Sequence, residues 1–131
     1  MTYVQELVKA SPAQSPVDEK QLIEAIELLY DGAATCTACA DACMDDMPHC
    51  AVTCLNCADV CLATAKVLSR TSAFDAETAR QLLSACEQIC RTCAEHCRMH
   101  ADDREHCRVC AESCERRADA CAQLIEALNA A

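Results

Sequence analysis

Apolar residues recur every three or four positions along most of this chain, which is the spacing that places them on one face of an α-helix. Near the start the stripe is aliphatic and contains Leu22, Ile23, Ile26 and Leu29. From Ala33 onward the same stripe continues, but cysteines take the apolar positions. The pattern predicts amphipathic helices whose inner face changes from aliphatic side chains to thiols.

The cysteines form the clearest repeat in the sequence. A run of four, spaced by four, three and four residues, occupies positions 50–61, and the same spacing returns at positions 86–97. Less complete runs occupy positions 36–43 and 107–121, and Ala118 stands where the last run lacks a cysteine. Residues three and four apart are neighbours on a helix surface, so each run places its thiols in one stripe. The sequence therefore predicts four helices, each with a thiol stripe.

Prolines and capping residues predict where these helices begin. Ser15 is expected to cap the first long helix, with Pro16 at its first helical position. Pro48 ends the turn at residues 45–48 and suits the first position of the second helix. The pattern breaks again at residues 69–72, before the third helix.

The N-terminal segment shows a short amphipathic pattern with Val4, Leu7 and Val8 on one side, followed by a break rich in Ser and Pro. We expect residues 1–15 to form a short helix and linker, and residues 16–131 to form a four-helix bundle with a Cys-lined core. Because the connections are short, neighbouring helices must run antiparallel. The predicted fold class is therefore all-α, an antiparallel up-down-up-down four-helix bundle with a short N-terminal helix.

This topology gives the bundle two different ends. The aliphatic segments meet at one end, and most cysteines lie in the middle and toward the other end. Every histidine and three of the four methionines lie at the turns of that second end, which we call the mouth: Met44, Met47, His49, His96, Met99, His100 and His106. Soft and borderline ligands would thus surround the opening of the thiol-lined interior. Among them, His96 is expected to point outward.

Composition supports helices and leaves the core short of large side chains. The 131 residues include one Phe, two Tyr, no Trp and 15 Cys, and the single Gly and three Pro argue against an all-β fold. Replacing large aliphatic side chains by Cys leaves cavities, each costing about 1 kcal/mol or more. Something other than side chains is therefore expected to fill the space between the helices.

Charge and hydropathy limit the partners. A net charge of −10 argues against nucleic acid, which needs clustered basic residues. Arg104, Arg108, Arg116 and Arg117 are expected to form a solvated face of the last helix. No stretch approaches the roughly 18 uninterrupted apolar residues of a membrane span, and residues 1–10 show no export signal, so we expect a cytosolic protein with no membrane partner. Thiols stay reduced in the cytosol, which argues against disulfides, as does the odd cysteine count.

Thiol-lined helices could hold several metals, and the spacing favours one. Zinc prefers about four thiolate or imidazole ligands in discrete sites, usually on loops. Iron–sulfur clusters need loops and room for inorganic sulfide. Cu(I) is soft and can share thiolates with neighbouring ions, which suits cysteines three or four residues apart. Each Cu(I) also balances one thiolate charge, so a core with many copper ions stays near neutral.

With Cys-x-x-Cys and Cys-x-x-x-Cys spacing on four helices and a His/Met mouth, the sequence resembles the bacterial copper storage proteins, in particular their cytosolic branch. The resemblance extends from about residue 17 to the C-terminus. It implies a four-helix bundle that binds many Cu(I) ions along its interior and assembles as a homo-oligomer, commonly a tetramer. The chain departs from the fullest family pattern at Ala118 and in its aliphatic segments, which implies a smaller capacity with copper concentrated toward the mouth.

We therefore interpret the protein as a cytosolic store that sequesters multiple Cu(I) ions per chain and is not an enzyme. Copper-handling proteins or small-molecule thiols are the expected partners for exchange at the mouth. The alternatives are a zinc or general soft-metal thiolate buffer and, from another class, an iron–sulfur or redox protein.

The candidate ligands differ in how well the pattern supports them. Cys54, Cys57, Cys90 and Cys93 are the best placed, because they are interior to complete runs, and Cys121 is the least secure because it lies beside the aliphatic end. The full set of candidate metal ligands is Cys36, Cys39, Cys43, Cys50, Cys54, Cys57, Cys61, Cys86, Cys90, Cys93, Cys97, Cys107, Cys110, Cys114, Cys121, Met44, Met47, His49, Met99, His100 and His106.

Overall fold

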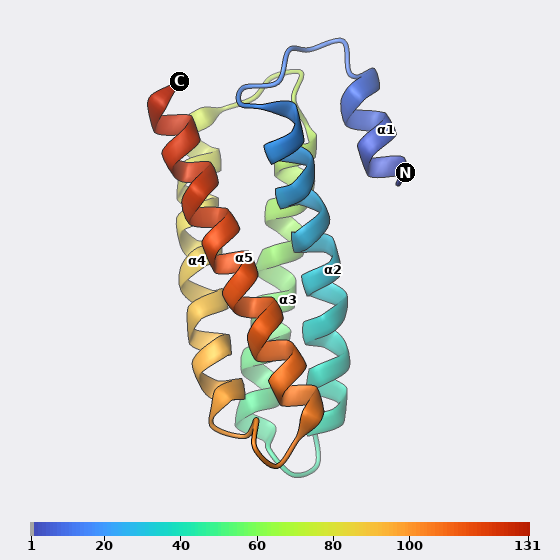
Figure 1. The fold of residues 1–131 in the computed structure, drawn as a ribbon, viewed down its shortest axis with the longest axis vertical. Coiled ribbons are helices and arrows are strands. Elements are labelled where there is room, and N and C mark those ends of the chain that lie inside the picture. Colours follow the sequence, from blue (N-terminus) through green and yellow to red (C-terminus); the bar gives the residue numbers. More distant parts are fainter. Residues whose placement is uncertain (1) are drawn as a thin grey trace.

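A short helix followed by four long ones makes up the computed structural model, which describes residues 2–131 (Figure 1). Residue 1, part of the predicted segment 1–15, lies outside the described residues. The helices are α1 Tyr3–Ala10, α2 Glu19–Cys43, α3 Pro48–Ser69, α4 Ala76–Arg98 and α5 Glu105–Ala130.

The four long helices run alternately up and down and pack around one core (Figure 1). Helix α2 packs against α3 and α5, and α4 packs against the same two helices. The α2–α3 and α4–α5 turns lie together at the lower end in Figure 1, and the α3–α4 turn lies at the upper end with the C-terminus. The prediction of an all-α antiparallel four-helix bundle with a short N-terminal helix is confirmed.

The start of α2 differs from the prediction. Asp18 is the cap, because its carboxylate accepts a hydrogen bond from the backbone N–H of Gln21 at 3.1 Å. The Ser15 hydroxyl instead donates to the carbonyl oxygen of Val17 at 2.6 Å, so the predicted Ser15 cap is wrong and Pro16 precedes the helix. A carboxylate also interacts more favourably with the helix dipole than a hydroxyl does.

The starts of α3 and α4 follow from local chemistry. Pro48 is the first residue of α3, as predicted, where its missing N–H costs no helical hydrogen bond. Asp75 caps α4 by accepting hydrogen bonds from the backbone N–H groups of Glu77 and Thr78 at 3.1 and 3.3 Å. These short, well-defined turns hold neighbouring helices antiparallel and bring their inner stripes face to face.

Two kinds of side chain fill the core, and they separate along the bundle axis as predicted. At the end away from the mouth the core is aliphatic, and its largest fully buried side chains are Leu22, Ile26, Leu29, Leu68, Leu83 and Leu124. Toward the mouth thiols replace them, accompanied by buried small residues such as Ala111. Because the side chains at the helix contacts are small in the part of the core toward the mouth, sulfur atoms occupy its centre.

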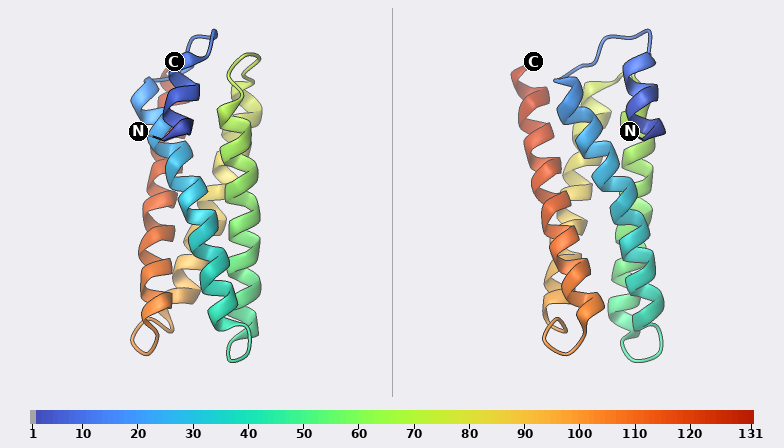
Figure 2. Two further views of the ribbon diagram at one scale, coloured as in Figure 1. Left: turned by 90° about the vertical axis from the view of Figure 1, so that its right-hand side faces the viewer. Right: turned by 45° about the vertical axis from the view of Figure 1, so that its right-hand side comes forward.

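Helix α1 lies along the outside of the bundle near the aliphatic end, beside α2 (Figures 1 and 2). The side-chain amide of Gln5 donates to both carboxylate oxygens of Glu27 on α2, at 3.1 and 3.2 Å. Val4 and Val8 are half-buried, but Leu7 is 73% exposed. The predicted apolar side of this helix is therefore only partly covered.

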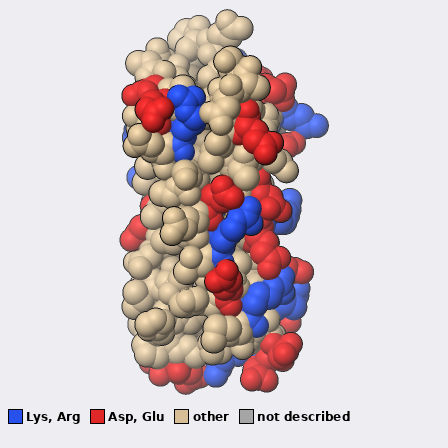
Figure 3. Space-filling model, turned by 90° about the vertical axis from the view of Figure 1, so that its left-hand side faces the viewer, with Lys and Arg blue, Asp and Glu red and all other residues tan. Residues whose placement is uncertain are grey.

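Acidic and basic side chains are interspersed on the face of the bundle shown in Figure 3. Among the pairs that link α4 and α5, Arg98 meets Glu115 at 2.9 Å. Helix α3 carries only Asp59 and Lys66 as charged residues, and by length and composition alone it could cross a membrane. Core helices of soluble proteins pass the same test, and the inner face of α3 is buried in the bundle, so the observation is weak evidence for a membrane.

Candidate metal centre

All 15 cysteines are buried and carry free thiols. Contacting sulfur atoms lie 3.6 to 4.0 Å apart, both along single helices and between helices. Within a helix, the contacting pairs are four residues apart at 3.9 to 4.0 Å, about twice the disulfide length of about 2.0 Å. An ion that binds two sulfurs at about 2.3 Å each spans at most about 4.6 Å, so these pairs can share an ion without moving the helices.

The mouth group consists of Cys39, Cys43, His106 and Cys107, whose ligand atoms all lie within 4.8 Å of one another. The Sγ atom of Cys43 is 3.8 Å from that of Cys107 and 3.4 Å from Nε2 of His106. The group joins the end of α2 to the start of α5. Because the imidazole of His106 is half-buried, it connects the thiols with the surface.

Two middle groups of four thiols follow further into the bundle, each again with sulfurs within 4.8 Å of one another. The first middle group is Cys39, Cys54, Cys97 and Cys110. The second middle group is Cys36, Cys93, Cys110 and Cys114. Cys39 belongs to both the mouth group and the first middle group, and Cys110 belongs to both middle groups. Three groups thus form one series connected by shared sulfurs.

The inner group consists of Cys57, Cys61 and Cys90, with sulfur–sulfur distances of 3.6 to 4.0 Å. Cys86 extends it, since its sulfur is 3.8 Å from that of Cys61. Unlike the other groups, the inner group shares no member with its neighbours along the bundle. By shared sulfurs, the thiol core thus consists of a connected series toward the mouth and an adjacent inner group, whose Cys57 also interacts with Cys36 and Cys114 of the second middle group.

Three cysteines, Cys50, Cys86 and Cys121, are buried without belonging to any of the four groups found among residues 2–131, although Cys86 contacts Cys61 of the inner group. Cys50 lies in the first turn of α3, at the mouth, and Cys121 lies on α5. The groups thus bring together most of the predicted cysteine ligands, including all four that the sequence favoured. They leave out Cys121, the one that the sequence favoured least.

The largest fully buried side chain of the protein is Arg117, which the sequence analysis placed on a solvated face. Its Nη1 donates to the sulfurs of Cys57 and Cys61 at 3.6 and 3.2 Å. Its Nη2 donates to the sulfurs of Cys36 and Cys114 at 3.1 and 2.9 Å. The solvated-face prediction is therefore wrong for this residue, whose guanidinium lies among thiols from three helices.

The register of α5 explains the error. Arg117 lies three residues after Cys114 and four before Cys121, so it continues the thiol stripe, a place that the sequence analysis gave to Ala118. Ala118 is buried as well. A second signal was Gly32, the only glycine, which costs about 1 kcal/mol relative to Ala inside a helix. A Cβ atom at that position would overlap the Arg117 side chain.

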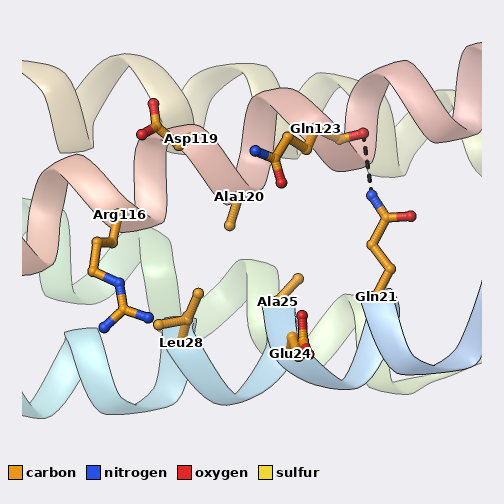
Figure 4. A pocket seen from close by; sticks show the side chains of 8 residues that line it. All are labelled: Gln21, Glu24, Ala25, Leu28, Arg116, Asp119, Ala120 and Gln123. Atoms are coloured by element: carbon orange, nitrogen blue, oxygen red, sulfur yellow. Dashed lines mark hydrogen bonds between the residues drawn. The ribbon is translucent and has the colours of Figure 1, made fainter.

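The other three arginines lie on the surface, as predicted. Arg104 pairs with Asp46 at 3.1 Å, and Arg108 pairs with Glu112 at 2.8 Å, all partly exposed. Arg116 is exposed in a shallow groove between α2 and α5, outside the thiol core (Figure 4). Only one of the four predicted surface arginines therefore enters the core.

Hydrogen bonds among the thiols change their acidity unevenly. The pKa of Cys54 is lowered to about 5 and that of Cys114 to about 6, in both cases chiefly by a hydrogen bond with Cys110. Burial raises the pKa of Cys107 to about 11. Burial also opposes the charge of Arg117, but the negative charge of the surrounding sulfurs outweighs it and raises its pKa. The core therefore combines thiolates with neutral thiols, which must lose a proton to bind metal.

The three predicted mouth methionines lie at the ends of helices. Met44 follows α2, Met47 precedes α3 and Met99 follows α4. Met47 is half-buried against the core, while Met44 is 54% and Met99 is 77% exposed. The thioethers thus range from the edge of the core to open solvent.

The histidines of the mouth also differ in placement. His49 and His96 stack with ring centroids 5.9 Å apart, and Nδ1 of His96 lies 3.4 Å from the Thr53 hydroxyl. His96 is half-buried, and the contacts of its ring are with His49 and Thr53 on α3. His100 is also half-buried, but His106 is the one that contacts a thiol in the mouth group.

Buried sulfurs that are shared between successive groups can hold several soft ions in a row. Hard ions such as Mg²⁺ or Ca²⁺ need carboxylates or carbonyls. Among residues 2–131 the buried polar or charged residues are Thr64, Thr71 and Arg117, and none of them is a carboxylate. The fold and the site together define a helical bundle that binds soft metal ions in its interior.

Comparison with known proteins identifies the family. Residues 18–126 match the family model of copper storage proteins, so the chain belongs to the copper storage protein family. It is 43% identical to the copper storage protein Ccsp from Streptomyces lividans, solved loaded with 10 copper equivalents. That match has a TM-score of 0.92 and covers 95% of this chain and 99% of that chain. The resemblance inferred from the cysteine pattern is confirmed.

Two further structures of that cytosolic protein are similar to this chain. The structure titrated to five coppers is 44% identical with a TM-score of 0.79, over 82% of this chain and 93% of that chain. A variant in which two histidines are replaced by alanine is 43% identical with a TM-score of 0.83, over 86% of this chain and 99% of that chain. No curated protein sequence matches the chain.

Proposed function

We propose that this protein stores and sequesters multiple Cu(I) ions in the cytosol, with its 15 cysteine thiolates as ligands. The observation that carries this proposal is the connected series of sulfurs, in which Cys39 and Cys110 each belong to two groups. A thiolate common to two groups can bridge two ions, which is how many closely spaced soft ions share a limited number of donors. The copper-loaded structures of the Streptomyces lividans relative support the same conclusion.

We propose storage rather than catalysis as the role of the thiols. Each is buried between helices, and its nearest polar neighbours are mostly other thiols. Catalytic sites, in contrast, are concave pockets that admit a substrate and present a few polar groups to it. A buried row of identical soft donors suits the retention of ions.

The mouth is the proposed route of uptake and release. His106 lies 3.4 Å from Cys43 and is half-buried, so it can bind an ion before the thiols do. We also propose that Met44, Met47 and Met99, together with His49 and His100, act as transient ligands at this end. Imidazole and thioether groups suit this role because they bind copper without first losing a proton at neutral pH.

Exchange partners and assembly follow from the same proposal. Copper-handling proteins or small-molecule thiols would deliver and remove ions at the mouth. The homo-oligomer, a tetramer by family resemblance, is supported by the apolar surface of α3, where Val52, Leu55 and Leu62 are 56%, 38% and 36% exposed. Such side chains are typical of surfaces covered by a second chain.

An anaerobic titration of the reduced protein with Cu(I), against a competing chromophoric chelator, tests the proposal. We expect a plateau above one Cu(I) per two thiols. Cys57→Ala removes a member of the inner group and should lower the plateau more than Cys121→Ala, which removes a ligand outside the groups. A wild-type plateau of one or two ions per chain would contradict storage.

Zinc is the second candidate, because each middle group offers four thiols, the number that a structural zinc site uses. The two ions differ in stoichiometry: Zn²⁺ should saturate near about one ion per four thiols. Adding Zn²⁺ to the copper-loaded protein separates the candidates further. Under the copper proposal Zn²⁺ displaces no Cu(I), and displacement would favour the zinc buffer.

A further inference from the structure

One positive charge lies inside the thiol core. Arg117 is 0% exposed, and within residues 2–131 it forms no ion pair with a carboxylate. Its guanidinium donates to four sulfurs, and its Nε donates to the backbone carbonyl of Ser113 at 3.2 Å. A buried charge is costly unless it is paired, so this cation depends on the electron-rich sulfurs around it.

The guanidinium lies where the series of shared sulfurs is interrupted. Nη2 contacts Cys36 and Cys114 of the second middle group, and Nη1 contacts Cys57 and Cys61 of the inner group. These two neighbouring groups share no sulfur. A cation in contact with thiols of both groups occupies the position that a bridging metal ion would otherwise take.

The chain provides room for this side chain. Gly32 on α2 faces it, and any larger residue there would overlap the guanidinium and its neighbouring carbons. The neighbouring Arg116 shows the ordinary alternative, since it lies beside Leu28 in the outer groove between α2 and α5 (Figure 4). Two consecutive arginines on one helix thus have opposite placements, and only the one in register with the thiol stripe has a glycine opposite it.

We propose that Arg117 takes the place of one Cu(I) ion in the core and divides the stored copper into two clusters, one in the mouth and middle groups and one in the inner group. This inference rests on the proposed copper storage. A guanidinium balances one thiolate charge, as a Cu(I) ion does, but cannot bridge sulfurs covalently. It also repels a cation placed at the same point, because charges interact strongly in the interior. A neutral residue at position 117 therefore opens the core to a further ion.

Counting bound ions by native mass spectrometry tests this. Wild type, Arg117→Gln and Arg117→Lys are loaded anaerobically with Cu(I) at one fixed excess of competing chelator. Gln keeps polar N–H donors but removes the charge, whereas Lys keeps the charge. We expect Arg117→Gln to hold about one more Cu(I) per chain than wild type, and Arg117→Lys to hold the wild-type number. Arg116→Gln, one residue away in the outer groove, is the matched control and should also hold the wild-type number.

The position of the additional ion can be tested with a second substitution. The sulfur of Cys61 is 3.2 Å from Nη1, so the gain caused by Arg117→Gln should vanish when it is measured in a Cys61→Ser background. The same gain should persist in a Cys50→Ser background, because Cys50 lies at the mouth and outside the groups. A gain that persists in both backgrounds would place the ion elsewhere and overturn the inference.

The remaining outcomes are distinguishable. If Arg117→Gln holds the wild-type number, or if Gln and Lys both gain an ion, the charge has no role and the inference is overturned. If wild type itself holds only one or two ions, the proposed storage fails instead. Should Arg117→Gln not fold, as judged by circular dichroism, Gly32→Ala serves in its place. Its Cβ would overlap the Arg117 side chain and force it away from the sulfurs, so the same gain is expected, and no gain in folded protein overturns the inference.

Discussion

The two ends of this bundle share the same helices and the same antiparallel packing, yet they are filled differently. At one end, leucines and isoleucines such as Ile26 and Leu83 are 0% exposed, and each such side chain contributes about 1.5–3 kcal/mol by burial. At the other end, thiols such as Cys54 and Cys97 meet at 3.8 Å, which is a weak contact between small side chains. The copper-free fold is therefore held chiefly by the aliphatic end.

This difference separates stability from binding. The thiol half places soft donors close together without filling its centre with large side chains, so ions can enter without displacing packed residues. The aliphatic half keeps the four helices in register while that occurs. Arg117 lies within the thiol half, as a resident cation between the second middle group and the inner group.

Copper loading should produce the largest change, and it should be greatest in the thiol half. Each ion that binds only the folded state adds about 4 kcal/mol at a free concentration 1,000 times its Kd, and several bind. The melting temperature should rise by at least about 10 °C in anaerobic calorimetry. Hydrogen exchange should slow more in residues 36–43 than in residues 22–29, because the ions also suppress local opening of the thiol half. Equal slowing in both segments would show that the two ends are not independent.

Leu83→Ala should produce the next largest effect, in the opposite half. This side chain is fully buried at the aliphatic end, and its truncation should cost about 2–5 kcal/mol of copper-free stability in urea unfolding. The number of bound Cu(I) ions should stay at the wild-type value. Leu55→Ala is the control, since Leu55 is 38% exposed and its truncation should cost less than about 1 kcal/mol. A loss of bound copper in folded Leu83→Ala would break the separation of the two ends.

Proton release should distinguish thiols within the copper-binding half. Cys107 has a pKa of about 11, so at pH 7 it is protonated and must release a proton to copper. Cys54 has a pKa of about 5 and is already a thiolate at that pH. With a pH indicator, Cys107→Ser should therefore release about one proton fewer than wild type on full loading, and Cys54→Ser about the same number. Below pH 11, lowering the pH should weaken copper binding at Cys107, because protons compete with copper for its sulfur. If Cys107→Ser and Cys54→Ser release equally fewer protons than wild type, the predicted difference in acidity between the two thiols is refuted.

His106→Ala should have the smallest effect, which should change the rate of copper loading and not the number of bound ions. Its imidazole lies 3.4 Å from the Cys43 sulfur at the surface of the mouth group. Without this transient ligand, stopped-flow loading with Cu(I) should slow several-fold, while the final number of ions and the melting temperature of the copper-free protein stay near wild type. His100→Ala, which removes a half-buried mouth histidine away from that sulfur, is the control and should slow loading less. Unchanged kinetics in His106→Ala would remove this residue from the uptake route.

Much of the fold could be predicted from the sequence because the governing signal is local. A spacing of three and four residues places Leu22, Ile26 and Cys36 on one helix face whatever lies opposite, and Pro48 begins a helix through its own fixed geometry. The same periodicity placed all 15 cysteines in the core. Even the gathering of histidines and methionines at one end followed from short connections and alternating helix directions.

Only the tertiary structure decided which thiols meet and where the cation lies. The sharing of Cys39 and Cys110 between groups depends on the relative rotation and stagger of neighbouring helices, which no single helix specifies. Arg117 stands at a position where either a surface or a core placement is compatible with helical periodicity. Gly32, on another helix, leaves the space into which its side chain extends. Burial of a side chain is settled by the helix that faces it, and that information is not local in the sequence.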